Sequence, residues 1–355
     1  MQTPKKIRIT DIAFMAGVSP GTVDRVLHHR GQVAEESRKK IMSIVEKYHY
    51  RPNIFARSLA RREPLRIVAL LPQHQTGEYW EAPEKGILRA EAEMHNYNIA
   101  VEKLYFNQFD AKSFANAAEM LLKSKPDAAL LAPTFRNEAV SLMQQLCERN
   151  IPGVYIDSNA ADDYYFSYFG QNSYQSGYVA AQLLQNGLPQ GTEILVVHTL
   201  HIDGISNQTQ RREEGFTAYF TQNKLTDHYH FVHVKLSVDD HRSNVVEIGK
   251  IVAQSRISAA IVFHSRVHYL ADIFKQLKIN HIRLIGYDLS GDNVPGLKEG
   301  LISFLIAQRP EDQGYQGIMA LCNWLIFNNE VKRINYVPID ILTKSNVDDY
   351  INYNN

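Results

Sequence analysis

The chain has 355 residues, of which 45% are hydrophobic, and a formal net charge of zero. This length exceeds one typical domain and allows a sizeable buried core. The zero hides an asymmetry, because residues 1–63 carry 13 Lys and Arg against 6 Asp and Glu, a net charge of +7 balanced by −7 in the rest. A basic segment joined to an acidic body is typical of proteins that bind DNA phosphates, with a membrane surface or a merely solvated face as the alternatives.

The chain contains two cysteines, Cys147 and Cys322, in apolar helical patterns where we expect buried free thiols. Their spacing predicts neither a disulfide framework nor a metal site, which fits a reducing compartment. The N-terminus lacks the apolar run of a signal peptide, and no run of about 18 apolar residues occurs anywhere. We therefore expect a soluble cytoplasmic protein with no membrane segment.

Residues 9–31, ITDIAFMAGVSPGTVDRVLHHRG, predict two short helices joined by a tight turn. Thr10 is suited to cap the first helix, Gly17 to end it with a positive φ, and Ser19-Pro20 to begin the second. The second helix has an apolar stripe formed by Val23, Val26 and Leu27. Its polar face is formed by Thr22, Asp24, Arg25, His28 and His29. This helix-turn-helix pattern favours insertion of the second helix into the DNA major groove, although an ordinary helical hairpin is the alternative.

A third helix is predicted over residues 33–48, with acidic residues in its first turn and an apolar face that includes Ile41 and Ile44. The next segment, NIFARSLARREP at 53–64, predicts a short helix that Asn53 can cap and that Pro64 ends. Because so short a helix is unstable alone in water, we expect it to fold only on contact with a partner.

From Leu65 onward, buried strands alternate with helices, which predicts parallel, doubly wound sheets arranged as two lobes. The expected strands are 66–71, 99–104, 128–131, 153–157, 193–198, 230–235, 259–263, 283–287 and 302–307. The expected helices lie near 82–95, 112–124, 137–149, 173–186, 209–222, 242–254, 268–277 and 311–328. The Asn-, Asp- and Tyr-rich residues 343–355 are expected to form a frayed end. Ligands of such sheets bind at the carboxyl ends of the strands.

Residues 9–41 and 50–60 closely resemble the lactose-repressor (LacI/GalR) family of bacterial transcription factors. The resemblance rests on ITDIAFMAGVSPGTVDRVLHHRGQVAEESRKKI and on YRPNIFARSLA, and residues 65–342 resemble ribose-type periplasmic sugar-binding domains more loosely. It implies a small all-α helix-turn-helix headpiece (1–52), a hinge helix or linker (53–64), a two-lobed α/β effector-binding and dimerisation domain of the periplasmic-binding-protein type (65–342) and a C-terminal tail (343–355).

The resemblance also implies a homodimer bound to a near-palindromic operator. The hinge helices would enter the minor groove, where Leu59 would wedge between base steps and Ala56 would permit close approach of the paired helices. Packing of Leu59 on the effector domain is the alternative. Two residues depart from the family pattern. Gly21 has no side chain to read a base, and Asp24 stands where relatives have a small hydroxyl residue. The Asp24 carboxylate is more simply explained by pairing with Arg25 or His28 than by contact with cytosine. The predicted DNA-binding residues are Thr10, Ser19, Pro20, Gly21, Thr22, Arg25, His28, Arg30, Asn53, Ala56, Arg57 and Leu59.

In the effector domain, the resemblance places ligand contacts on loops that face the cleft between the lobes. Tyr79 and Trp80 offer flat rings for a sugar, although Trp80 alternatively plugs the sheet. Arg212 matches a family arginine that binds sugar oxygens, with a surface salt bridge to Glu214 as the alternative. Arg266 indicates either an anionic effector or a helix-capping surface arginine. The predicted effector-binding residues are Gln73, Glu78, Tyr79, Trp80, Asp157, Asn172, Arg212, His264, Arg266, Asp288 and Gln308.

Two other functions are less consistent with the sequence. A transport-type solute-binding protein has the same two lobes but needs a signal peptide in place of residues 1–63. An enzyme is disfavoured because no G-x-G-x-x-G, P-loop or G-x-S-x-G motif occurs, and the 14 histidines show no H-E-x-x-H pair typical of zinc. We therefore expect a transcriptional regulator of carbohydrate-utilisation genes, controlled allosterically by a sugar-like effector, with no cofactor, metal or catalytic residue.

Overall fold

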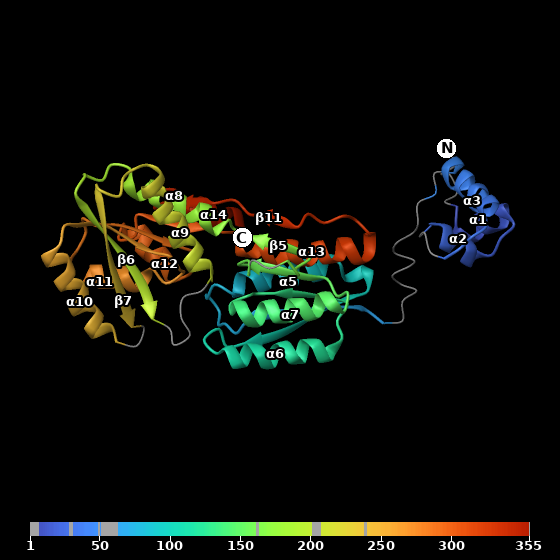
Figure 1. Cartoon of the computed structure of the whole chain (residues 1–355), viewed down its shortest axis with the longest axis horizontal. Helices are drawn as coiled ribbons and strands as arrows, with labels where there is room; N and C mark the ends of the chain where they lie inside the picture. The colour runs from blue at the N-terminus through green and yellow to red at the C-terminus, as the bar shows by residue number, and fades with distance from the viewer. Residues whose placement is uncertain are drawn as a thin grey trace. The chain divides into compact units, whose positions relative to one another are not determined.

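The computed structural model describes residues 7–27, 31–48, 50, 63–160, 163–200, 207–237 and 240–354, and the chain divides into two compact units, Met1–Arg62 and Glu63–Asn355 (Figure 1). The predicted residues His28, Arg30, Asn53, Ala56, Arg57 and Leu59 lie outside the described ranges. Within those ranges, no helix is both long and apolar enough to cross a lipid bilayer.

The first unit contains helices α1 (Ile9–Ala16), α2 (Pro20–Leu27) and α3 (Glu35–Lys47). They bury one small cluster, formed by Ile12, Ala13, Ala16, Val23, Val26 and Ile41. Gly17 adopts φ 68° after α1, and the Ser19 hydroxyl oxygen accepts the Thr22 amide at 3.2 Å, so both expectations for this turn are confirmed. The capping role of Thr10 was wrong, because α1 already begins at Ile9 and the Asp11 carboxylate accepts the Arg8 amide at 2.8 Å.

The second unit contains two six-stranded sheets, which confirms the predicted two-lobed, doubly wound fold. The sheet of the first lobe has the order β11-β5-β4-β3-β1-β2, and that of the second lobe the order β12-β10-β9-β8-β6-β7. All pairs are parallel except β10–β12. The strands are β1 (Leu65–Pro72), β2 (Ile99–Phe106), β3 (Ala128–Leu131), β4 (Gly153–Asp157), β5 (Ser167–Gly170), β6 (Thr192–Leu200), β7 (Tyr229–Ser237), β8 (Ile257–Val262), β9 (Arg283–Tyr287), β10 (Phe304–Ala307), β11 (Ile334–Tyr336) and β12 (Asp340–Leu342).

Helices cover both faces of each sheet, as the two layers around each set of strands in Figure 1 show. They are α5 (Glu81–Glu93), the 3-10 turn η1 (His95–Tyr97), α6 (Ala111–Ser124), α7 (Arg136–Glu148), α8 (Ser173–Gln185), α9 (Asn207–Gln222), α10 (His241–Gln254), α11 (His268–Gln276), α12 (Asn293–Glu299), α13 (Pro310–Phe327) and α14 (Val347–Asn354). Separate buried clusters fill the layers, so each lobe has its own core.

The chain passes between the lobes three times, after β5, after β10 and after β11. Gln171, which is buried directly after β5, joins the three passages, because its Nε2 donates to the carbonyl oxygens of Ala307 (3.0 Å) and Pro338 (3.3 Å). The Tyr168 hydroxyl donates to the Gln171 carbonyl oxygen at 3.0 Å. Buried bonds of this kind fix the path of the backbone where the lobes meet.

A pair of helices in each lobe crosses at glycine positions. A Cβ on Gly86 of α5 would lie 1.9 Å from the carbonyl oxygen of Glu311 in α13. In the second lobe, a Cβ on Gly177 of α8 would lie 1.8 Å from the carbonyl oxygen of Arg212 in α9. Only glycine permits backbones to approach so closely, and in the second lobe this contact sets the position of the segment that carries Arg212.

Two further expectations from the sequence were wrong. Residues 343–355 do not fray throughout, because α14 places Val347 fully in the second lobe's core, where Tyr350 and Ile351 also pack. Cys147 is exposed on α7 instead of buried, whereas Cys322 is buried in α13, which raises the pKa of its thiol to about 12.

Candidate functional site

Two aspartates lie at equivalent positions of the two lobes. Asp157 ends β4 and Asp288 follows β9, and these strands are third in the order of their sheets. Both residues are buried and both adopt φ 69°. Left-handed backbone is uncommon outside glycine, although Asp tolerates it better than most residues, and such strain is often retained at binding sites.

Amide and hydroxyl groups from separate elements converge on these carboxylates. Gln308, which follows β10, donates from Nε2 to Asp288 Oδ1 at 2.8 Å and to Asp157 Oδ1 at 3.4 Å. Gln208 of α9 donates to the same Asp157 oxygen at 3.2 Å, and the Tyr79 hydroxyl donates to it at 2.6 Å. The ends of three strands, the loop after β1 and the start of α9 therefore form one largely buried polar cluster.

Arg212 places a positive charge in this cluster. Its side chain is fully buried, its Nη1 donates to the Phe263 carbonyl oxygen at 2.8 Å, and its guanidinium carbon lies 3.9 Å from the centroid of the Tyr287 ring. Its Nε and Nη2 have no hydrogen-bond partner among the described residues. The alternative of a surface salt bridge was wrong for Arg212, since the neighbouring Arg211 is the one that pairs with Glu214, at 2.5 Å.

Burial dominates the ionisation of the two aspartates. The pKa of Asp288 rises to about 6, mainly through burial and with help from the Asp157 charge, against the Arg212 charge and the Gln308 hydrogen bond. Burial also raises the pKa of Asp157, while the Tyr79 hydrogen bond, the Arg212 charge and the Gln208 hydrogen bond oppose that rise. The protonation of Asp288 therefore changes near pH 6.

The loop after β1 contributes one ring to the cluster. Tyr79 points its hydroxyl at Asp157, and Trp80, which is only 8% exposed, meets the Tyr79 ring edge-on with 5.1 Å between centroids. Gln73 and Glu78 are exposed, and the Glu78 carboxylate accepts the Gln75 amide at 2.9 Å within its own loop. Tyr79 is therefore the loop residue that the structure brings to the aspartates.

The residues after β8 lie at a contact between the lobes. His264 accepts the Arg266 amide through Nδ1 at 3.2 Å, and both side chains are half-buried. The Arg266 guanidinium carbon lies 5.1 Å from the centroid of the Phe109 ring, which belongs to the first lobe. Arg266 thus contacts an aromatic ring across the lobes, which neither of the two sequence interpretations anticipated.

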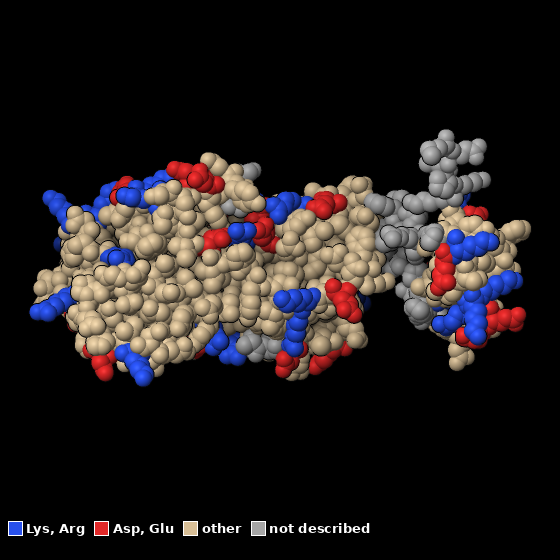
Figure 2. Space-filling model, turned by 90° about the horizontal axis from the view of Figure 1, so that it is seen from above, with Lys and Arg blue, Asp and Glu red and all other residues tan. Residues whose placement is uncertain are grey.

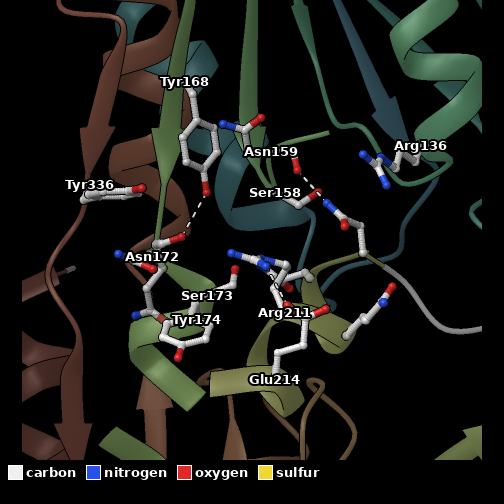
Figure 3. A pocket seen from close by; sticks show the side chains of 14 residues that line it. Arg136, Ser158, Asn159, Tyr168, Asn172, Ser173, Tyr174, Arg211, Glu214 and Tyr336 are labelled. Atoms are coloured by element: carbon white, nitrogen blue, oxygen red, sulfur yellow. Dashed lines mark hydrogen bonds and ion pairs between the residues drawn. The ribbon is translucent and has the colours of Figure 1, made fainter. Parts of the chain in front are cut away.

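A polar cavity of about 370 Å³ adjoins the cluster through Gln208 and is lined from both lobes. Figure 3 shows Arg211 and Glu214 directed toward each other at one end, and Tyr168, Tyr174 and Tyr336 along one side. Asn172 is the predicted effector residue in its wall, and its Oδ1 also accepts the Gln175 amide at 3.1 Å, which caps α8. A volume of 300–1,000 Å³ is typical of small-molecule sites. The lining residues are Arg136, Ser158, Asn159, Tyr168, Gln171, Asn172, Ser173, Tyr174, Asn207, Gln208, Gln210, Arg211, Glu214 and Tyr336.

Sequence reasoning missed two glutamines that complete the cluster. Gln208 precedes Arg212 by one helical turn, so the period of α9 would have placed both on one face. Gln313 of α13 donates from Nε2 to the Gln308 carbonyl oxygen at 2.6 Å and accepts the Asp157 amide at 2.8 Å. No motif distinguishes Gln313 from the other polar residues of its helix.

In the first unit, the start of α2 is open to solvent. Four residues here are exposed, namely Ser19, Pro20, Gly21 and Arg25, and Thr22 is half-exposed. The Arg25 Nε donates to the Gly21 carbonyl oxygen at 3.3 Å. Figure 2 shows several Lys and Arg side chains gathered on the visible face of this unit. An exposed helix start with a neighbouring basic surface has the character of a DNA-binding surface.

Comparison with known proteins places both units in one family. The pattern described as "Bacterial regulatory proteins, lacI family" matches residues 8–53, and "Periplasmic binding protein domain" matches residues 68–328. A solved protein from Bacteroides fragilis, described as a LacI transcriptional regulator, is 36% identical with a TM-score of 0.75, and the match covers 81% of this chain and 100% of that one. The chain belongs to the LacI family.

Other relatives agree with this assignment. The sucrose operon repressor of Pediococcus pentosaceus is 25% identical over 290 residues, which cover 80% of this chain and 82% of the repressor. GanP, a glucose-galactose binding protein from Geobacillus stearothermophilus, is 19% identical with a TM-score of 0.69 over 81% of this chain and 99% of that one, a likeness in fold. The LacI-family chain is a DNA-binding transcriptional regulator with an effector domain of the periplasmic-binding-protein type.

Proposed function

We propose that this regulator binds a carbohydrate at the cluster of Asp157, Asp288 and Arg212, and that binding there controls the affinity of a homodimer for operator DNA. The observation that carries the proposal is the pair of guanidinium nitrogens, Nε and Nη2 of Arg212, that are buried without partners among the described residues. Unsatisfied buried donors are costly, and a ligand that accepts hydrogen bonds relieves that cost.

A neutral sugar fits the charges of the cluster better than an anion does. Sugar hydroxyls donate to carboxylates and accept from a guanidinium, so one ring can satisfy both kinds of group. A phosphate or carboxylate at Arg212 would face the charges of Asp157 and Asp288. The nearby Arg211 is already paired with Glu214, and Arg136 donates to the Ala160 carbonyl oxygen at 3.0 Å. The name of the Pediococcus relative, a sucrose operon repressor, also supports control of carbohydrate genes.

We propose that the DNA contacts are made by α2. We also propose that the protein acts in the cytoplasm, where the operator lies. Thr22 and Arg25 present polar groups from the exposed side of α2, opposite the buried Val23 and Val26. Two such helices in a dimer match two operator half-sites, as the helix-turn-helix requires. We propose neither transport nor catalysis for the cleft, since a DNA-binding headpiece precedes it and the named relatives regulate transcription.

The effector proposal is tested with a panel of neutral sugars, sugar acids and sugar phosphates in a thermal-shift screen, followed by calorimetric titration of any hit. Arg212→Gln tests the proposed donor, and Arg242→Gln is a matched control because it removes an exposed arginine of the same lobe that does not line the cavity. We expect a neutral sugar to bind wild type and Arg242→Gln, with at least tenfold weaker binding to Arg212→Gln. Equal affinity for all three proteins, or hits confined to anionic compounds, would overturn the proposal.

A further inference from the structure

Two histidines and a glutamate converge beside α9, outside the aspartate cluster. His198 of β6 and His233 of β7 lie on one face of the sheet, because His233 pairs with Val196 and His198 pairs with Lys235 in the parallel register. Glu213 of α9 covers this face beside them. The His198 side chain is 10% exposed, that of Glu213 26% and that of His233 52%, so the group is anchored but open to solvent on one side.

The three ligand atoms have nearly equal separations. His198 Nε2 lies 3.2 Å from His233 Nδ1, and Glu213 Oε1 lies 3.6 Å from the first nitrogen and 3.7 Å from the second. A point equidistant from three atoms with these separations lies about 2.0 Å from each, which is the length of a zinc–imidazole or zinc–carboxylate bond. The atoms are thus spaced as ligands of one ion.

Hydrogen bonding alone explains this arrangement less well. A single ring proton can join the two histidine nitrogens, but Glu213 Oε1 lies beyond hydrogen-bond distance from both of them.

We propose that His198, His233 and Glu213 bind a divalent transition-metal ion, for which zinc has the best fit, with water as a further ligand. Two histidines and a carboxylate form an established zinc ligand set. The sequence did not predict a metal site, because the three residues come from separate elements and have none of the motif spacings that reveal zinc ligands. Glu213 directly follows Arg212, so a bound ion would tie the helix that carries the cluster arginine to β6 and β7.

The surroundings of His198 limit the expected affinity. A ligating histidine usually donates its other ring N–H to a carboxylate or carbonyl group, and losing that support weakens binding 10- to 100-fold. His198 Nδ1 is buried with no hydrogen-bond partner among the described residues. We therefore expect a dissociation constant on the order of micromolar, weaker than that of a structural zinc site.

The test uses the full-length, tag-free protein after dialysis against a chelator. Zinc chloride is titrated by calorimetry, and cobalt chloride is added separately to follow the visible absorption of the bound ion. The variants are His233→Ala and Glu213→Gln, and His230→Ala is the matched control because His230 is exposed on the same strand but outside the group. Cys147 is present in every variant, so zinc bound by its exposed thiol cancels in the comparison.

We expect wild type and His230→Ala to bind one more zinc ion than His233→Ala and Glu213→Gln do, and to gain about 3 °C or more in melting temperature at saturating zinc. The cobalt absorption should be lost in the same two variants. Unchanged zinc stoichiometry in both variants, or no binding by wild type, would overturn the proposal. The readout needs neither DNA nor sugar, so it stands apart from the proposed function.

Discussion

Replacing Asp288 with asparagine should stabilise the effector-free protein while weakening effector binding. The pKa of Asp288 rises from its ordinary value of 3.8 to about 6 because the carboxyl group is buried beside Asp157. This difference corresponds to about 3 kcal/mol of folding free energy when the group is fully ionised. The substituted asparagine keeps an oxygen that can accept the Gln308 amide, which donates to Asp288 Oδ1 at 2.8 Å, so the main hydrogen bond survives the change.

The pH dependence distinguishes this cause from a general change in packing. The folded state binds the Asp288 proton more tightly than the unfolded state does. The stability that this proton adds to the folded state is therefore complete below about pH 3.8 and is lost as the pH rises through about 6. Asp288→Asn should therefore exceed wild type by about 3 kcal/mol above pH 7, and the advantage should shrink toward zero near pH 4.

Chemical denaturation at fixed protein concentration, from pH 4 to pH 8, measures both quantities. Asp163→Asn is the control, because that side chain is 96% exposed and its removal should change stability by less than about 0.5 kcal/mol at any pH. An Asp288→Asn protein that is no more stable than wild type at pH 8, or whose advantage does not vary with pH, would show that the buried charge of Asp288 does not destabilise the fold.

Three further predictions concern the same domain. Gly177→Ala should lower the free energy of unfolding by about 1–3 kcal/mol and weaken effector binding, because the new methyl group would lie 1.8 Å from the Arg212 carbonyl oxygen. The control is Gly249→Ala, whose methyl group would lie 3.7 Å from its nearest neighbour. It should be neutral or stabilising in the same denaturation and titration assays. Affinity for a neutral sugar that donates to Asp288 should fall about tenfold from pH 7 to pH 5 by calorimetry, and a flat profile would exclude that carboxylate as the acceptor. Deleting residues 344–355 should lower the melting temperature by about 3–8 °C, because it removes the fully buried Val347, and an unchanged transition would show that α14 adds nothing to the core.

The long elements of the fold follow from apolar periodicity, but the short ones do not. Continuous apolar runs such as the one in β1 predict buried parallel strands directly. Residues 334–336 form a strand of three residues, half-buried or exposed, whose order comes from pairing with β5 and not from their own pattern. The tail is polar in sequence, yet Val347, Tyr350 and Ile351 lie on one face of α14, a signal that its many Asn and Asp residues obscure.

Part of the candidate site was predictable for a similar reason. Asp157, Asp288 and Gln308 follow strands, and the strand-end rule for doubly wound sheets brings such residues together. The choice between Arg211 and Arg212 depends on which face of α9 is buried. Phe216, one turn after Arg212, is buried too, so helical period favours Arg212. The metal-ligand group depends on the register of two strands and the position of a helix, which a single sequence does not specify.

Sugar binding at the aspartate and arginine cluster is proposed to control DNA binding by the headpiece. The most direct test selects operator duplexes from a random pool with wild type. It then measures the dissociation constant of the best duplex at fixed salt, with and without the identified sugar, for wild type and Arg212→Gln. We predict that the sugar changes the operator affinity of wild type at least fivefold and leaves that of Arg212→Gln unchanged, as expected for a coupling between two sites. An operator affinity that the bound sugar does not change in wild type would show that the cluster does not control DNA binding.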